Sequence, residues 1–483
     1  MNRASAAMIK GFMRFGPALL PFADAATREL PMSRLLRLSL FQITVGMAAV
    51  LLIGTLNRVM IVELNVPSSI VAIMLALPLL FAPLRALVGF RSDTHRSYLG
   101  WRRVPFIWMG TMLQFGGLAI MPFALLILSG DTTGPLIVGQ IGAALAFLLV
   151  GAGLHTVQTV GLALATDLAP EQVRPRVVAL LCAMLLLGMA VSALIFGYAL
   201  SNFSQIRLIQ VVQGSAVVTI VLNGFALWKQ EPRSFTLAPD GSRRAAFQSA
   251  WQSFARVDRT RRRLFATSLG TAAFSMQDIL LEPYGGKILH MAVAATTSMT
   301  AVLALGGGLG LILAARWLSH QADPHRVAAI GVVIGIVAFC ALILSAPMNV
   351  AFLFAIGVAL IGVGAGMFAH GTLTATMALA PAQDRGLALG AWGAAQATAA
   401  GLAIGLSGTI NDLCAGLAVT GAFGEALIDP ATSYAIVYGL EIVLLFATLI
   451  VIGPLVRSSP RKEGCNERFN LLSTNTLSSE GVR

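Results

Sequence analysis

Two acidic residues lie inside an apolar stretch of the sequence, where a charged side chain is costly. Asp278 and Glu282 are four residues apart, so on a helix their side chains project from one face. Ionisable groups within a membrane-spanning helix are functional candidates by default, and these carboxylates, with the neighbouring Gln277, are candidate ligands for a bound cargo. In the alternative interpretation the acids are structural and pair with Arg58 or Lys287 near the outer surface.

Two histidines in other apolar stretches are the next candidates. His155 and His370 occupy near-equivalent positions in an internal repeat, because an offset of 211 residues aligns His155 with Gly366, about one helical turn from His370. A neutral imidazole can bind a metal, including the magnesium of a chlorin. In the alternative interpretation each histidine is hydrogen-bonded to a neighbouring helix.

The elements that must position these residues are helices in a lipid bilayer. Of the 483 residues, 57% are hydrophobic and only 11% are charged, whereas soluble proteins carry roughly 25% charged residues. A spanning helix needs about 20 mainly apolar residues. Runs of this kind cover residues 37–60, 67–89, 105–129, 136–161, 178–200, 207–228, 264–285, 292–314, 327–346, 350–376, 387–409 and 432–455. We therefore predict an all-α integral membrane protein with twelve transmembrane helices.

The basic residues predict the orientation of these helices. Of the 33 Lys and Arg residues, 30 fall in loops and tails on one side, and the other side holds only Arg58, Arg207 and Lys287. The positive-inside rule places the basic side, and with it both termini, in the cytoplasm. The positive net charge is therefore a topology signal and does not indicate a nucleic-acid partner. The four scattered cysteines predict neither a disulfide framework nor a metal cluster.

The loops after the fourth and the tenth predicted spans are alike. Residues 168–174 read Leu-Ala-Pro-Glu-Gln-Val-Arg and residues 379–385 read Leu-Ala-Pro-Ala-Gln-Asp-Arg, so five of seven positions match at an offset of 211. A duplication of this kind predicts two six-helix halves. We expect an amphipathic cytoplasmic N-terminal segment at 1–33, halves at 34–228 and 264–456, a basic cytoplasmic linker at 229–263 and a cytoplasmic tail at 457–483.

The loop after the second span contains Gly89, Asp93, Gly100, Arg102 and Arg103. It resembles the G-x-x-x-D-R-x-G-R-R loop of the major facilitator superfamily, although the interval from Asp93 to Gly100 is longer. We expect an inner latch in which Asp93 bonds a helix N-terminus or an arginine and ties the halves together. The latch residues are Asp93, Arg102, Arg103, Arg174 and Arg385. The alternative is an ordinary solvated loop.

Several longer stretches carry a more specific likeness. They cover residues 21–26, 34–42, 57–64, 91–95, 100–105 and 275–286, and the last ends in Leu-Glu-Pro-Tyr-Gly-Gly, which is not a general transporter pattern. In these stretches the chain resembles the light-harvesting complex assembly proteins of purple photosynthetic bacteria. This is the PucC and LhaA type, also called the bacteriochlorophyll delivery family, a branch of the major facilitator superfamily.

The resemblance implies a non-enzymatic role in building antenna complexes, with light-harvesting 1 favoured over light-harvesting 2. It implies that bacteriochlorophyll is a bound cargo delivered to antenna polypeptides, or that these polypeptides are chaperoned. The pigment-binding candidates are Asp278, Glu282, His155, His370 and Gln277. The implied partners are the antenna polypeptides and the reaction-centre core, together with bacteriochlorophyll synthase and the membrane insertion machinery. The implied location is the bacterial inner (intracytoplasmic) membrane.

Two other functions stay open. A transporter of this shape would move a small apolar solute or a pigment precursor by alternating access, and a docking protein would hold antenna polypeptides without pigment. The sequence contains no Walker A, GxSxG or zinc motif that would favour an enzyme. The scarcity of charge within the predicted spans suits an apolar cargo or a protein client better than a sugar or an ion.

Overall fold

The computed structural model describes residues 30–80, 88, 91–92, 100–130, 133–170, 173–231, 260–378, 385–422, 424 and 428–456. Within these residues, eleven helices are long and apolar enough to cross a membrane. A further apolar helix, α3, has a described part of 13 residues, Ser68–Leu80. The chain is therefore a multi-pass membrane protein, and its apolar helices follow one another in the predicted order.

The first half begins with α2 (Met32–Ala49), which continues without a loop through two π-helical segments, η2 (Val50–Leu56) and η3 (Val59–Glu63). The remaining helices of this half are α3, α5 (Val104–Leu128), α6 (Leu136–Leu168), α7 (Arg174–Ala199) and α8 (Gln205–Leu227).

The second half begins with α10 (Thr260–Ser275), which passes into a 3₁₀ segment, η5 (Met276–Ile279), and a short helix, α11 (Leu281–Lys287). It continues with α12 (Val293–Ser319), α13 (Pro324–Met348), α14 (Ala351–Met377), α15 (Arg385–Val419), α16 (Ala431–Ile452) and the 3₁₀ segment η8 (Gly453–Leu455).

Several predicted spans differ from the observed elements, among them the fourth, 136–161, which is observed as Leu136–Leu168. The first, 37–60, is part of a longer run, Met32–Glu63, and the eleventh, 387–409, extends to Val419. Apolar composition marks only the part of a helix that meets hydrocarbon, and the backbone continues its hydrogen bonding beyond it. The seventh, 264–285, is divided among α10, η5 and α11, and this division depends on tertiary contacts described below.

Glycines bring neighbouring helices together in the same way in both halves. A Cβ added to Gly110, where α5 meets α6, would lie 2.9 Å from the carbonyl oxygen of Gly153. A Cβ added to Gly331, where α13 meets α14, would lie 2.6 Å from the carbonyl oxygen of Gly364. Close backbone approach through small residues is a common way for helices to associate in lipid. Gly153 and Gly364 are related by the 211-residue offset of the sequence repeat, so the repeated sequence has a repeated packing contact.

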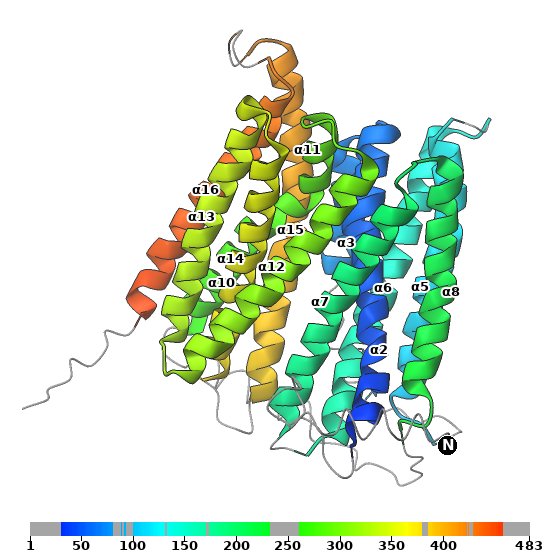
Figure 1. Ribbon diagram of the computed structural model, residues 1–483, viewed down its shortest axis with the longest axis vertical. Helices are drawn as coiled ribbons and strands as arrows, with labels where there is room; N and C mark the ends of the chain where they lie inside the picture. The colour runs from blue at the N-terminus through cyan, green and yellow to red at the C-terminus, as the bar shows by residue number, and fades with distance from the viewer. Residues whose placement is uncertain are drawn as a thin grey trace, which may run out of the picture.

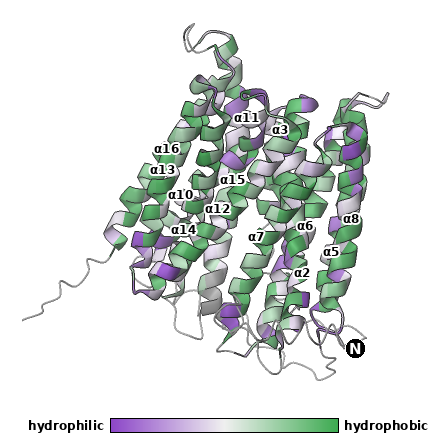
Figure 2. Ribbon diagram, viewed as in Figure 1, coloured by the Kyte–Doolittle hydropathy of each residue, from purple (hydrophilic) through white to green (hydrophobic). Residues whose placement is uncertain are grey.

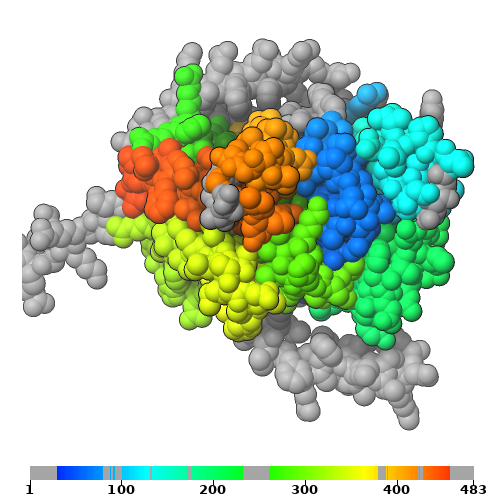
Figure 3. All heavy atoms as spheres, turned by 90° about the horizontal axis from the view of Figure 1, so that it is seen from above, coloured from blue at the N-terminus to red at the C-terminus, as the bar shows by residue number. Residues whose placement is uncertain are grey.

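The two halves lie side by side (Figures 1 and 3), and they meet where α7 packs against α12 and α3 packs against α15. We name the two ends of the bundle after residues they hold. The Glu63 end, uppermost in Figure 1, contains η3 and α11, and the Arg102 end contains the starts of α2 and α5. Hydrophobic residues line most of the helix lengths between the two ends (Figure 2).

Candidate functional site

A polar junction joins the halves where the first helix of each loses regular α-helical geometry. Asn57 lies between the π-helical segments η2 and η3, and its Nδ2 donates to the carbonyl oxygens of Asp278 at 3.3 Å and Ile279 at 3.0 Å. A break in a helix leaves carbonyls without their usual partners, and here an amide from the other half satisfies two of them. π-helical insertions are frequent at functional sites.

Arg58 forms the second contact of this junction. Its side chain is buried, with Nη1 2.5 Å from Glu63 Oε1 and Nη2 donating to the Met291 carbonyl of the second half at 3.1 Å. An added Cβ at Gly286 would lie 3.0 Å from Arg58 Nη2, so glycine leaves the space that the guanidinium occupies. A buried charge is tolerated when it is paired and hydrogen-bonded in this way.

Glu282 is buried in the same junction, with only 3% of its surface exposed. The Thr300 hydroxyl donates to its Oε1, and Gly54 lies against it without room for a side chain. Glu282 is also near enough to Arg58 for their charges to interact. The hydrogen-bond partner of Glu282 is therefore Thr300, while Arg58 forms its ion pair with Glu63; whether Glu282 has a structural or a binding role stays a prediction.

Asp278 differs from Glu282, because it is only half-buried. Gln277 Nε2 donates to its Oδ1 at 2.5 Å. Glu441 of α16 lies near enough for the two carboxyl groups to interact electrostatically, and it is fully buried with no hydrogen-bond partner for either oxygen among the described residues. The sequence placed Glu441 in another helix, and the structure brings it to the η5 segment.

Tyr284 anchors α11 within the second half. Its hydroxyl donates to the Leu342 carbonyl at 2.9 Å, and its ring packs 5.5–5.6 Å from the rings of Phe354, Tyr434 and Tyr438. Edge-to-face and stacked aromatic contacts of this kind add specific packing energy to simple burial. The Leu-Glu-Pro-Tyr-Gly-Gly run is thus explained by its contacts: Glu282 meets Thr300, Tyr284 enters an aromatic cluster, and Gly286 makes room for Arg58.

A second tie between the halves lies at the same end of the bundle. The Asp412 carboxylate of α15 accepts from the backbone amides of Ser68 at 3.2 Å and Ser69 at 2.7 Å, at the start of α3. A carboxylate at a helix N-terminus satisfies free amides and complements the helix dipole. Asn411 Nδ2 adds a bond to Ser68 Oγ at 3.4 Å. The described hydrogen bonds between halves therefore gather at the Glu63 end.

The sequence did not single out Asn57, Thr300 or Asp412 as site residues. Each is a polar residue in a predicted span or at its edge, and that was the available signal. Their partners lie between 18 and 344 positions away in the chain. Sequence spacing alone does not identify such partners.

The two histidines lie on α6 and α14, helices that carry none of the junction residues named above. His155 is a half-buried residue of α6, and His370 is a half-buried residue of α14, whose backbone carbonyl accepts from the Thr374 hydroxyl at 2.9 Å. The structure therefore brings Gln277, Asp278 and Glu282 together and leaves the histidines on other helices. Their role in binding stays a prediction.

Three arginines of the predicted latch, Arg102, Arg103 and Arg174, make contacts within the first half. Asp167 accepts from Arg102 Nη2 at 2.5 Å and from Arg103 Nε at 2.6 Å. Arg174 Nε donates to the carbonyls of Thr166 at 3.1 Å and Ala169 at 3.2 Å. Asp93 and the side chain of Arg385 lie outside the described residues. The tie between halves at this end therefore stays a prediction.

Glu231 organises the same end of the first half. Its carboxylate accepts from the backbone amides of Arg102, Arg103 and Val104, at 2.9–3.1 Å, where α5 begins. Its neighbour Gln230 is held by Arg34 of α2, whose Nε donates to Gln230 Oε1 at 3.1 Å. The start of the predicted linker is therefore attached to the first half.

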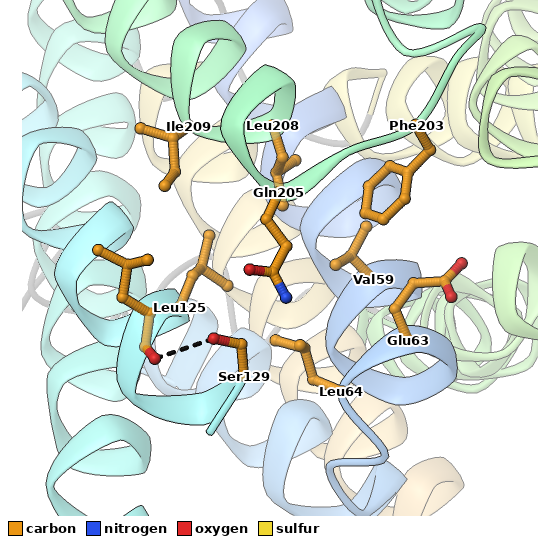
Figure 4. A pocket seen from close by; sticks show the side chains of 10 residues that line it. Val59, Glu63, Leu64, Leu125, Ser129, Phe203, Gln205, Leu208 and Ile209 are labelled. Carbon is orange, nitrogen blue, oxygen red and sulfur yellow. Dashed lines mark hydrogen bonds between the residues drawn. The ribbon is translucent and has the colours of Figure 1, made fainter. Parts of the chain in front are cut away.

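A small pocket opens beside the junction at the Glu63 end (Figure 4). Its walls are mainly apolar and come from η3, the end of α5 and the start of α8, and Glu63, Gln205 and Ser129 supply its polar groups. Glu63 is the residue that pairs with Arg58, so one wall of the pocket belongs to the junction.

The sequence as a whole assigns the chain to a family. Residues 55–459 match a sequence model of the family described as PUCC protein. The chain belongs to the PUCC protein family. Protein PucC of Rhodovulum sulfidophilum is 56% identical over 405 residues, which cover 83% of this chain and 89% of that protein. This finding confirms the resemblance drawn from the sequence stretches.

Two other relatives of this PUCC family member extend the comparison. An uncharacterised protein in the puhA-bchM intergenic region of Rhodobacter capsulatus is 53% identical over 453 residues, covering 93% of this chain and 95% of that protein. The bacteriochlorophyll synthase 44.5 kDa chain of Rhodobacter capsulatus is more distant, with 28% identity over 375 residues, covering 76% of this chain and 84% of that protein.

Solved structures show the fold of this PUCC family member. A bacterial homologue of the iron transporter ferroportin, in an inward-facing state, matches with a TM-score of 0.64 and 15% identity over 88% of this chain and 98% of that chain. A bacterial homologue of the human lysosomal transporter Spinster matches with a TM-score of 0.62 and 16% identity, over 89% of this chain and 98% of that chain. The predicted all-α fold of the major facilitator superfamily is confirmed.

Proposed function

We propose that this protein is an assembly factor for a photosynthetic light-harvesting complex, with light-harvesting 1 favoured over light-harvesting 2. It delivers bacteriochlorophyll to antenna polypeptides or chaperones them, and its role is non-enzymatic. Membership of the PUCC family over residues 55–459 is the observation that carries this proposal. The distant likeness to a protein named as a bacteriochlorophyll synthase chain supports a connection with the pigment.

The use of charged groups within the bundle supports an apolar cargo or a protein client. Arg58 and Glu63 pair with each other, and Glu282 is bonded to Thr300 within the junction. Each of these two contacts is formed within one half, and Arg58 adds a hydrogen bond across the junction to the Met291 carbonyl. A carrier of hydrophilic solutes needs several polar groups that remain available for its substrate. Of the four acids described at the junction, Asp278 and Glu441 are the two without a basic or hydroxyl partner among the described residues, and this small number favours a hydrophobic cargo.

The surroundings of the candidate ligands rank them for binding a pigment. The magnesium of bacteriochlorophyll needs an accessible donor atom, because the broad macrocycle must lie next to it. Asp278, His155 and His370 are half-buried, whereas Glu282 and Gln277 are buried, at 3% and 2% exposed. We therefore place Asp278 first as the magnesium-facing residue, with the two histidines as alternatives. Gln277, which bonds Asp278, positions that carboxylate.

An absorption experiment tests the pigment proposal. The protein is purified in a gentle detergent from a host that makes bacteriochlorophyll, and its spectrum is recorded beside that of the Asp278→Asn variant. Pigment bound to the wild type and depleted from the variant is the expected result. Exposed Asp429, at the start of α16, provides Asp429→Asn as a matched control that should keep its pigment. Pigment-free wild type, with normal antenna assembly by Asp278→Asn, would refute the site.

The proposal includes partners and a location. We infer that the chain acts in the bacterial inner (intracytoplasmic) membrane with both termini in the cytoplasm, which follows from its 30 basic residues on one side. We infer contacts with the antenna polypeptides, the reaction-centre core, bacteriochlorophyll synthase and the insertion machinery, by analogy with the family. Deleting the gene and recording which antenna band is lost distinguishes the two light-harvesting clients.

Alternating-access transport of an apolar solute or a pigment precursor is the second candidate. The gathering of hydrogen bonds between halves at the Glu63 end favours it, since such bonds close one end of a transporter. An added Cβ at Gly197 of α7 would lie 2.8 Å from Ser298 Oγ of α12. A disulfide between Gly197→Cys and Ser298→Cys, in a background without other cysteines, should abolish transport reversibly, whereas a scaffold would keep its activity.

A further inference from the structure

One face of α8 has the pattern of a helix-packing seam but packs against no described element. The seam consists of residues spaced three or four apart, which is the spacing that meshes with a second helix. Its members are Ile206, Gln210, Gln213, Val217, Val221, Gly224 and Trp228. Ile206, Val217, Val221 and Trp228 are 70%, 58%, 51% and 65% exposed. α8 lies at the edge of the bundle in both views (Figures 1 and 3).

Gln213 is the more deeply placed of the two exposed amides in this seam. It is the ninth residue of the 23-residue helix, so it lies about 12 Å from the start of α8 at about 1.5 Å per residue. The hydrocarbon core is about 30 Å thick, which places the Gln213 amide well inside it. That amide carries two donors and an acceptor, and exposing them to hydrocarbon costs several kcal/mol.

The buried face of the same helix shows how such an amide is normally satisfied. Asn223 Nδ2 donates to Thr111 Oγ1 at 2.9 Å, and its Oδ1 accepts from the Thr44 hydroxyl at 2.9 Å. The exposed Gln213 side chain makes no hydrogen bond to another described residue. Two amides on one helix therefore have opposite surroundings, and the outward one requires a partner from outside the chain.

The shape and charge of the face indicate what that partner is. No atom lies within 4 Å of a Cβ built on Gly224, so a second helix can approach closely there. Arg207 and Lys229, both exposed, flank the seam at its two ends. A parallel pair of α8 helices from two copies of the protein would bring these like charges together at both ends. A helix of a different polypeptide, with neutral or acidic flanks, avoids this repulsion.

We propose that this face of α8 docks a transmembrane helix of a client polypeptide, which places a hydrogen-bonding side chain against Gln213 and an apolar side chain over Gly224. The inference rests on the proposed function only in identifying the partner as a client of assembly. Lipid chains can cover the valines of the seam, but they offer no group to Gln213, and a client helix supplies both kinds of contact.

Site-specific photocrosslinking tests the docking face in the full-length protein. A photoreactive amino acid replaces Val217 in a host that makes antenna complexes, and a matched probe replaces Val337, which is 55% exposed on α13. A covalent adduct with another membrane polypeptide should form at position 217 and be absent at 337. Gln213→Leu should lower the adduct yield about threefold, and Gln213→Asn should retain much of it because the amide is kept.

The outcomes separate this inference from the proposed function. Adducts at 217 only with lipid, with pigment or with a second copy of the chain would overturn the docking proposal, as would an unchanged yield in Gln213→Leu. Gln213 is exposed, so its replacement leaves the internal packing in place. Restoration of antenna absorption by the wild-type gene in a deletion strain tests the assembly role independently. A chain that restores the antenna but forms no polypeptide adduct would refute only the docking face.

Discussion

Replacing Asn57 with leucine should separate the halves at the Glu63 end. The substitution removes the bonds from Nδ2 to the Asp278 and Ile279 carbonyls, which are 3.3 and 3.0 Å long. Each hydrogen bond between membrane helices contributes about 0.6 kcal/mol on average, and leaving buried carbonyls unsatisfied costs at least about 1 kcal/mol more. The total of about 2 kcal/mol raises the ratio of separated to joined molecules roughly 30-fold. A separated population of about 1% would then become about one quarter.

A distance measurement between spin labels reads this population directly. Labels at Asn202→Cys and Thr420→Cys, two exposed positions that follow α7 and α15 at the Glu63 end, report on opposite halves. The native cysteines are first replaced, since several are at least partly accessible. Asn57→Leu should add a population at longer distance. Asn223→Leu is the matched control, because its bonds to Thr44 and Thr111 lie within the first half. Equal distributions in wild type and Asn57→Leu would refute the reasoning.

Three further substitutions extend the test. Asp412→Ala removes the carboxylate that caps α3 at Ser68, which costs about 1 kcal/mol. It should raise the long-distance population several-fold less than Asn57→Leu does, and no change would exclude a tie there. Gly286→Leu places side-chain atoms where the Arg58 guanidinium lies, so the long-distance population should rise, and an unaltered distribution would show that Arg58 does not join the halves. Glu231→Gln weakens the anionic cap of α5. It should lower the melting temperature in detergent most at low salt, while the label distance stays that of the wild type.

The membrane character and the span order could be predicted because they depend on composition along short windows. Hydrocarbon excludes unpaired polar backbone, so any stretch of about 20 apolar residues must become a helix. The sequence repeat at 168–174 and 379–385 indicated two halves for a similar reason, since each loop carries its own local signal. Asp278 and Glu282 were found as rare acids in an apolar segment, and they do lie at the junction of the halves.

The roles of those acids could not be predicted, because their partners lie in other helices. Glu282 meets Thr300, Gly54 and Arg58, and Asp278 meets Gln277 beside Glu441. Sequence spacing places Asp278 and Glu282 on one helix face, and it treats them as equivalent. The 3₁₀ segment η5 (Met276–Ile279) interrupts that helix, so one acid ends half-buried and the other almost fully buried.

The sequence by itself determined that this chain is a helical membrane protein of the PUCC family, since lipid imposes helices on apolar segments and the family stretches are local. Only the tertiary structure decided which polar side chains hold the halves together and which remain available. Asn57 reaches carbonyls more than 220 positions away, and Asp412 caps a helix 344 positions away. The physical reason is that an amide or carboxylate in hydrocarbon must find a partner wherever packing offers one. The side-chain amide of Gln213 in α8 has no hydrogen-bond partner among the described residues, and this contrast is the basis for proposing a partner outside the chain.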